Sequence, residues 1–211
     1  MARKEDGIKG LTFRRLPVIV GALLIAGMAA WTGVTQTSFF GELVKGGGPA
    51  KCSGTLAPGT YSGVVVQSGN TCTINSSDVI TGNVSVNSNA TLNDQGSSIG
   101  GNLAAGSNSN LFVSPSGGYA STTASINGNL TTSGASVVSV NQATIGGNVT
   151  VQGTITSTSI TNNTIINNLT VSGDTGTTTV TNNTVGHNAS CSNNTAFVGG
   201  GNAAGGQDTC N

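Results

Sequence analysis

The stretch that decides the fold is Ile145-Gly146-Gly147-Asn148-Val149-Thr150-Val151, because its pattern returns along most of the chain. By residue type it reads aliphatic, any, Gly, Asn, aliphatic, any, small or apolar. Further copies are ITGNVSV (80–86), IGGNLAA (99–105), INGNLTT (126–132) and the more degenerate IINNLTV (165–171) and VGHNASC (185–191). The six aligned asparagines, here called the signature asparagines, are spaced by 19, 27, 19, 20 and 20 residues: Asn83, Asn102, Asn129, Asn148, Asn168 and Asn188.

The residues within and between the copies predict strands. Val149 and Val151 alternate with Thr150, as expected of a strand with one buried face. Further strand-like segments lie between the copies, such as VVSV (137–140) and NNTI (162–165), whereas no helical period is found. Three short strands in each period of about 20 residues predict an all-β fold, a right-handed parallel β-helix of about eight coils over residues 52–211.

Four glycines precede signature asparagines and are interpreted as corner residues: Gly82, Gly101, Gly128 and Gly147. A Cβ is costly in a tight corner, and asparagine tolerates left-handed backbone geometry. Stacked asparagine amides can also hydrogen-bond from coil to coil. We therefore interpret the ten Asn-x-Ser/Thr sequons beyond residue 51 as ladder and corner residues rather than as glycosylation sites.

The four cysteines form two pairs, each separated by one period. Cys52 and Cys72 are 20 residues apart, and Cys191 and Cys210 are 19 apart. Stacked coils bring such residues to about 5 Å, within reach of a disulfide. The sequence therefore predicts one disulfide at each end of the solenoid, where a strand edge needs protection.

The spacing of 27 residues between Asn102 and Asn129 indicates an insertion of about seven residues within 105–126. Its centre is Ser114-Pro115-Ser116-Gly117-Gly118. It is interpreted as a surface loop, and a role in binding is the alternative.

The N-terminal segment predicts export. Residues 1–15 are basic and are expected to stay in the cytoplasm, and residues 16–34 form an uncharged apolar run. The run is close to the roughly 20 residues that span a bilayer. We expect an apolar helix over 16–34, either a cleaved signal peptide or a retained membrane anchor, followed by a Gly-rich linker over 35–51. A buried core helix is a third alternative. A pilin-type leader cleaved after Gly10 is a fourth, although Arg15 stands where such pilins carry an acidic residue.

The charge distribution excludes several partners. All seven Lys and Arg residues lie within the first 51 residues. Binding of nucleic acid or of anionic lipid requires cations, so neither is expected for residues 52–211. No cofactor or metal is expected, because His187 lies near only one cysteine in the sequence.

The sequence also argues against catalysis. The carboxylates beyond residue 51 (Asp78, Asp94, Asp174 and Asp208) form no close pair in any motif, as a glycosidase requires. Lyase chemistry lacks a basic residue, and an extended carbohydrate platform lacks aromatic residues. A polysaccharide-active enzyme is therefore the least favoured of the alternatives.

Residues 52–211 resemble a family of secreted β-helix proteins of unknown function that is common in actinobacteria. The resemblance rests on GTLAPGTY (54–61), Thr71-Cys72, the Gly-Gly-Asn repeats and the terminal Cys210; Asn167 and His187 depart from it in glycine positions. It implies an extracellular address and no catalytic residues. A weaker similarity is to bactofilins, which are β-helix filament proteins.

These observations predict a non-catalytic, extracytoplasmic structural or adhesive module, secreted or anchored through residues 16–34. Its partner would be a surface ligand or a component of the cell envelope. A self-associating, filament-forming subunit is the main alternative. Ice binding through rows of threonine is another, although a matching Thr-x-Thr pattern is absent from most coils.

Overall fold

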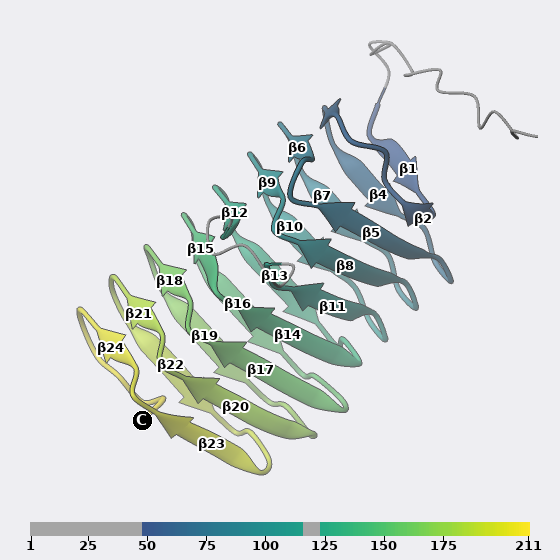
Figure 1. The fold of residues 1–211 in the computed structure, drawn as a ribbon. Coiled ribbons are helices and arrows are strands. Elements are labelled where there is room, and N and C mark those ends of the chain that lie inside the picture. The colour runs from purple at the N-terminus through teal and green to yellow at the C-terminus, as the bar shows by residue number, and fades with distance from the viewer. Residues whose placement is uncertain (1–47, 116–122) are drawn as a thin grey trace, which may run out of the picture. The chain divides into compact units, whose positions relative to one another are not determined.

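The computed structural model describes residues 48–115 and 123–211, which form a parallel β-solenoid of three sheets (Figure 1). The predicted helix over 16–34 and most of the predicted linker lie outside these residues. Within the two described ranges, no helix has the length and hydropathy of a membrane span.

Each turn contributes one strand to sheet A, one to sheet B and one to sheet C, in that order along the chain. Sheet A contains β1 (Ala50–Cys52), β4 (Val64–Val66), β7 (Val84–Val86), β10 (Leu103–Ala105), β13 (Leu130–Ser133), β16 (Val149–Gln152), β19 (Leu169–Ser172) and β22 (Ala189–Ser192). Sheet B contains β2 (Gly54–Thr55), β5 (Thr71–Asn75), β8 (Thr91–Gln95), β11 (Asn110–Val113), β14 (Val137–Asn141), β17 (Ser157–Thr161), β20 (Thr177–Thr181) and β23 (Phe197–Gly200). Sheet C contains β3 (Thr60–Tyr61), β6 (Val79–Ile80), β9 (Ser98–Ile99), β12 (Ala124–Ile126), β15 (Ala143–Ile145), β18 (Thr164–Ile165), β21 (Thr184–Val185) and β24 (Ala203–Ala204).

The sequence predicts about eight coils. The solenoid has eight strands in each sheet and completes about seven full turns from the first strand to the last, because eight strands are separated by seven steps. The first strand begins at Ala50, so Ala50 and Lys51, which were predicted to be linker, pair with β4. The predicted insertion lies between β11 and β12, from Ser114 to Thr123, at the connection from sheet B to sheet C.

The core consists of stacked aliphatic side chains, one from each turn. In sheet C the row Ile80, Ile99, Ile126, Ile145, Ile165 and Val185 is almost fully buried. Because successive side chains of a strand point to opposite faces, the residues between the aliphatic ones point outward. The short strands thus give a narrow apolar interior enclosed by polar faces.

Two of the three corners use left-handed backbone geometry. Between sheets A and B seven of the eight connections have a residue at φ between 54 and 77°: Gly69, Asn89, Asn108, Gly134, Gly153, Gly173 and Asn193. The first has Gly54 at φ 81° instead. Between sheets B and C five turns have one at φ between 53 and 97°: Gly96, Gln142, Asn162, Asn182 and Gly201. The corner between sheets C and A, which carries the signature asparagines, has no positive φ. The predicted left-handed geometry at the signature corner is therefore wrong, because tight stacking, and not φ, selects its residues.

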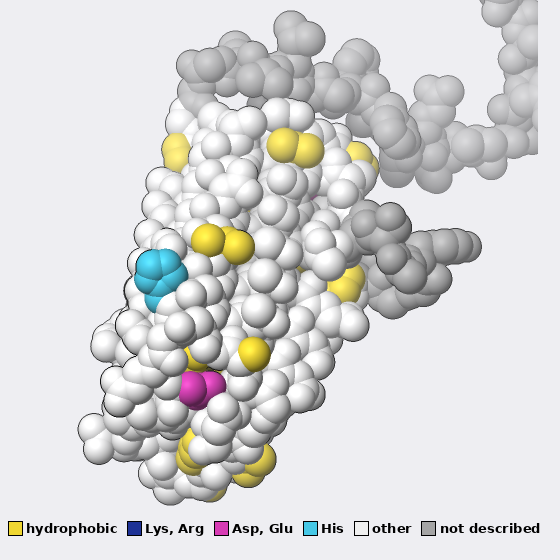
Figure 2. All heavy atoms as spheres, turned by 90° about the vertical axis from the view of Figure 1, so that its left-hand side faces the viewer, with side chains coloured by type: hydrophobic (Ala, Val, Ile, Leu, Met, Phe, Trp, Pro, Cys, Tyr) yellow, Lys and Arg dark blue, Asp and Glu magenta, His cyan; other side chains and the backbone are white. Residues whose placement is uncertain are grey.

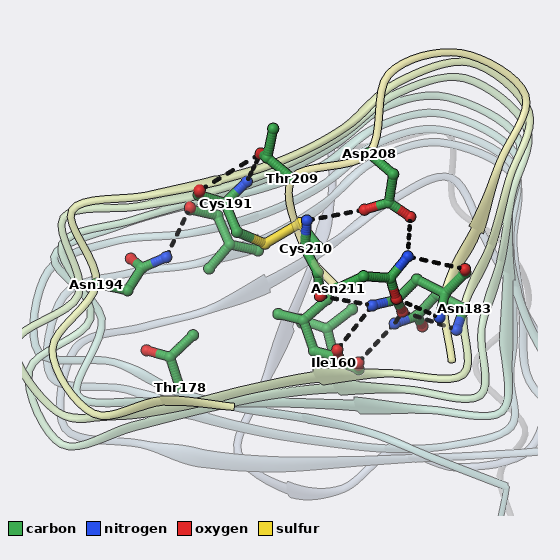
Figure 3. Close-up of a disulfide and its surroundings, with 12 residues drawn as sticks. Ile160, Thr178, Asn183, Cys191, Asn194, Asp208, Thr209, Cys210 and Asn211 are labelled. Atoms are coloured by element: carbon green, nitrogen blue, oxygen red, sulfur yellow. Dashed lines mark hydrogen bonds between the residues drawn. A yellow bond between two sulfur atoms is a disulfide. The ribbon is translucent and has the colours of Figure 1, made fainter. Parts of the chain in front are cut away.

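The C-terminal end of the solenoid is closed by the last five residues (Figure 3). Asp208 forms a parallel bridge with Ala189, and the Thr209 N–H donates to the Ala189 carbonyl at 2.9 Å. Cys210 is fully buried and is disulfide-bonded to Cys191, with a Cα–Cα distance of 5.0 Å. The tail thus pairs with β22 and covers the core there.

Candidate binding faces

The disulfides lie where the cysteine spacing predicts. Cys52 is bonded to Cys72 with a Cα–Cα distance of 5.5 Å, and Cys191 is bonded to Cys210. Each bond joins adjacent turns, one at each end of the described solenoid. Neither pair is available for catalysis or for metal binding.

The signature asparagines form a continuous hydrogen-bonded ladder along the corner between sheets C and A. Each Oδ1 accepts two bonds from the next turn, one from a backbone N–H and one from an Nδ2 group. The ladder ends at Asn188, whose Oδ1 accepts the Gln207 N–H at 2.8 Å. Since an amide nitrogen carries two hydrogens, each Nδ2 that donates within the ladder keeps one for a partner outside it.

The residue before each signature asparagine affects the length of the backbone hydrogen bond in this ladder. A Cβ built on Gly101, Gly128 or Gly147 would lie 2.4 to 2.5 Å from the Oδ1 of the preceding asparagine. After Gly101, Gly128 and Gly147 the backbone N–H lies 2.8 Å from that oxygen. After Asn167 and His187, which carry a Cβ, the distance is 3.2 Å. The glycines are therefore selected by close approach of the stacked amide.

A second asparagine ladder is buried at the corner between sheets B and C, and sequence reasoning missed it. Asn163 donates through Nδ2 to Asn183 Oδ1, and Asn183 donates to Asn202 Oδ1, both at 3.0 Å. These three side chains also donate to the carbonyls of Val140, Ile160 and Val180. The signal was the repeated Asn-Asn-Thr in 162–164 and 182–184.

Nine of the ten sequons follow from these rows; Asn75-Ser76-Ser77 is the exception. Five of them place a signature asparagine at the corner, an inward residue next and an outward hydroxyl third, as in Asn148-Val149-Thr150. Four others begin with a left-handed asparagine, followed by a buried or partly buried residue and an outward threonine, as in Asn162-Asn163-Thr164. The repeat geometry thus accounts for the pattern without a glycan.

The outward side of sheet A, here called face A, carries three polar columns. Over β13, β16, β19 and β22 each strand presents an asparagine, a central hydroxyl and a third polar side chain in register. This set is called the amide–hydroxyl grid: Asn129, Thr131, Ser133, Asn148, Thr150, Gln152, Asn168, Thr170, Ser172, Asn188, Ser190 and Ser192. Nearer the N-terminus, Ala104 and Gly106 replace the hydroxyls and leave a shallow depression of about 470 Å³.

The other two faces are interrupted by exposed apolar side chains. Sheet B presents Phe112 and Val198, which are 37% and 57% exposed. Val79 of sheet C and Ile166, which directly follows β18, are 42% and 51% exposed. Ile155, in the connection that follows β16, is 50% exposed. The grid on face A contains no exposed apolar side chain, and it differs from the polar columns of sheet B by its hydrogen-bonded row of signature asparagines.

Charged groups are nearly absent from the described surface, as the face in Figure 2 illustrates. Asp78, Asp94 and Asp174 are buried. Each accepts backbone N–H groups: Asp78 from Gly59 and Asn75, Asp94 from Gly96 and Ser97, and Asp174 from Thr154. Burial raises the pKa of Asp94, an effect that these hydrogen bonds oppose. These carboxylates support backbone turns.

In residues 48–115 and 123–211 the side chains form no metal-binding group, since no three His, Cys, Asp or Glu side chains are placed there so as to hold a metal ion. His187 is exposed at its corner, and its backbone groups bond to Asn167 and Gly206. Comparisons with protein-family models, with curated proteins and with solved structures find no match.

Proposed function

We propose that this chain is a non-catalytic, extracytoplasmic β-solenoid that serves as a structural or adhesive module of the cell surface. The observation that carries the proposal is the contrast between faces and interior. The faces present neutral hydroxyl and amide groups in rows, while three of the four carboxylates beyond residue 51 are buried against backbone amides. Such a surface suits many weak, neutral contacts better than chemistry on a bound substrate.

The address is supported by the disulfides and by the sequence before the solenoid. Two disulfides are compatible with an oxidising compartment. Anchoring through residues 16–34, or cleavage near them, belongs to this proposal. The proposal also includes a right-handed winding of the solenoid, because about 98% of parallel crossovers are right-handed. It further includes the relationship to secreted actinobacterial β-helix proteins.

The filament alternative is less well supported. Continuous end-to-end stacking needs a free strand edge at each end of the subunit. At the C-terminal end, Asp208 and Thr209 already pair with Ala189, and Asn211 Oδ1 accepts the Asn202 N–H. This pairing occupies the edge of sheet A at β22 and so opposes end-to-end stacking through that sheet, whereas β23 and β24 are still the last strands of sheets B and C.

The test measures both the cellular location of the chain and its activity on envelope material. Labelling of intact cells with a reagent that cannot cross the membrane, followed by N-terminal sequencing, should find the solenoid outside and identify the cleavage site. The purified full-length chain should bind isolated envelope material and release no reducing sugar from it. A cytoplasmic chain, or sugar release that requires one of the aspartates, would overturn the proposal.

A further inference from the structure

We infer that the amide–hydroxyl grid of face A is a docking face for an ordered, neutral polysaccharide. This inference rests on the adhesive function proposed above and assigns it a surface and a ligand class. The ligand would be a glycan in which hydroxyl groups, or hydroxyl and acetamido groups, repeat in a regular array.

The first step is that the grid is preorganised. The ladder fixes the side chain of each signature asparagine in the grid. The amide N–H that the ladder does not use is therefore held in a fixed position as well. The central hydroxyls stand on paired strands in a register-matched row, Thr131 to Thr150 to Thr170 to Ser190. Groups that are already ordered lose little entropy on binding.

The second step is that the grid is periodic in two directions. Strands lie about 4.8 Å apart, and successive outward residues of one strand lie about 6.6 Å apart. A single hydrogen bond to a ligand contributes little, because it replaces bonds to water. A partner with its own repeat can engage many positions at once, which multiplies weak contacts. An ordered polymer surface meets this requirement and a small molecule does not.

The third step is chemical. All twelve side chains of the grid are uncharged, and all are amides or hydroxyls. Nucleic acid and anionic lipid require cations that the grid lacks. Protein interfaces use aromatic and apolar residues at their centre, and the grid has none. A glycan on the grid would therefore be held by hydrogen bonds alone, and not by stacking of sugar rings on aromatic side chains. Neutral glycans offer the hydroxyl and carbonyl acceptors that free amide N–H groups need.

The experiment measures adsorption of the purified full-length chain to suspended microcrystalline chitin and cellulose. Adsorption is expected, with little dependence on salt because no charges take part. Thr150→Arg places a bulky charge at the centre of the grid and should weaken adsorption about tenfold or more. Thr179→Arg makes the same change at an outward position of sheet B and is the matched control, expected to leave adsorption unchanged.

A second pair of variants removes hydroxyls without adding charge. Thr131→Val, Thr150→Val and Thr170→Val together should weaken adsorption, whereas Ser139→Val, Ser159→Val and Thr179→Val in the same turns should not. Urea midpoints equal to that of the wild type show that each variant is folded. Adsorption to chitin alone would indicate acetamido recognition, and adsorption to both solids hydroxyl recognition.

Three results would overturn the inference: no adsorption of the wild type to either solid, adsorption to ice crystals only, or equal adsorption of the Thr150 and Thr179 variants. The proposed function is tested separately. If the chain still binds isolated envelope material in these cases, the adhesive role stands and only the face or the ligand is wrong.

Discussion

Gly101, Gly128 and Gly147 show how a side chain in one turn dictates the residue in the next. The oxygen that would collide with a Cβ at Gly147 belongs to Asn129, and it accepts the backbone N–H of Asn148 at 2.8 Å. Gly and Asn are therefore coupled between turns. The asparagine side chain of one turn needs a glycine beside it in the next turn, and that glycine allows the short hydrogen bond from the backbone N–H that follows it. His187 and Asn167 show that the pair can be broken at the cost of a longer bond.

This coupling predicts the effect of Gly147→Ala. The added Cβ would lie 2.5 Å from Asn129 Oδ1 and 2.7 Å from the Gly128 carbonyl oxygen, so two turns must separate locally. We expect a loss of about 1–3 kcal/mol in the free energy of unfolding, as for other overpacked sites. Urea unfolding measures it. Asn167→Ala is the control, because that corner already holds a Cβ and should change by less than about 0.5 kcal/mol. Equal losses would contradict the ladder argument.

Asp94 predicts a pH dependence. Burial raises its pKa in the folded state, so the folded chain binds this proton more tightly than the unfolded chain. The protonated form thus favours folding at low pH, and that contribution is lost as the pH rises through the folded pKa. Asp94→Asn keeps an acceptor for Gly96 and Ser97 without the buried charge. It should be more stable than the wild type at neutral pH, with a gap that closes towards acidic pH. Chemical unfolding at several pH values measures this, and a gap independent of pH would show that the charge is not the cause.

At the scale of the elements, the corners differ more than the strands do. The aliphatic alternation and the 20-residue spacing predict the three strands of each turn, because burial of one face leaves a period of two in the sequence. The corners are harder, because Gly and Asn serve two purposes. At Asn162 and Gly153 they provide positive φ, and at Asn148 and Gly147 they provide tight stacking with ordinary φ. Residue type alone does not separate these roles.

The buried ladder shows a second limit. Asn163 and Asn183 were not predicted as core residues, because asparagine is usually exposed. Their burial is possible only because every polar atom finds a partner in an adjacent turn, and such partners exist only after the turns are stacked. The cysteine pairs were predictable for the opposite reason, since one period of separation was sufficient to place them together.

The two ladders predict different costs for the same substitution. Asn183→Ala removes four side-chain hydrogen bonds at a buried site and takes away one partner of the Ile160 carbonyl. We expect a loss of about 2–4 kcal/mol. Asn148→Ala removes three at the surface, where water replaces them, and should cost about 1 kcal/mol or less. Thermal and urea unfolding of both variants measure the difference, and similar values would mean that burial does not distinguish the ladders.

At the scale of the whole molecule, the solenoid is an elongated stack whose stability is close to a sum over neighbouring turns. Its ends are then the weak points, because an end turn has a neighbour on one side only. The two disulfides join end turns to the turns beside them, which limits fraying. At the C-terminal end the tail also pairs with β22, so that the edge of sheet A is covered there as well.

Removal of the C-terminal closure in two stages should separate its covalent part from its pairing. Cys191→Ser with Cys210→Ser removes only the covalent link and should cost about 3 kcal/mol. The chain should stay monomeric, because Asp208 and Thr209 still pair with Ala189. Deletion of residues 207–211 also removes that pairing and the bond from Asn202 to Asn211, so it exposes a strand edge and apolar core together. Exposed edges recruit further strands, and the truncated chain should therefore self-associate. Light scattering after size-exclusion chromatography distinguishes the two variants. A monomeric truncated chain would mean that the tail stabilises the last turn without guarding it against association.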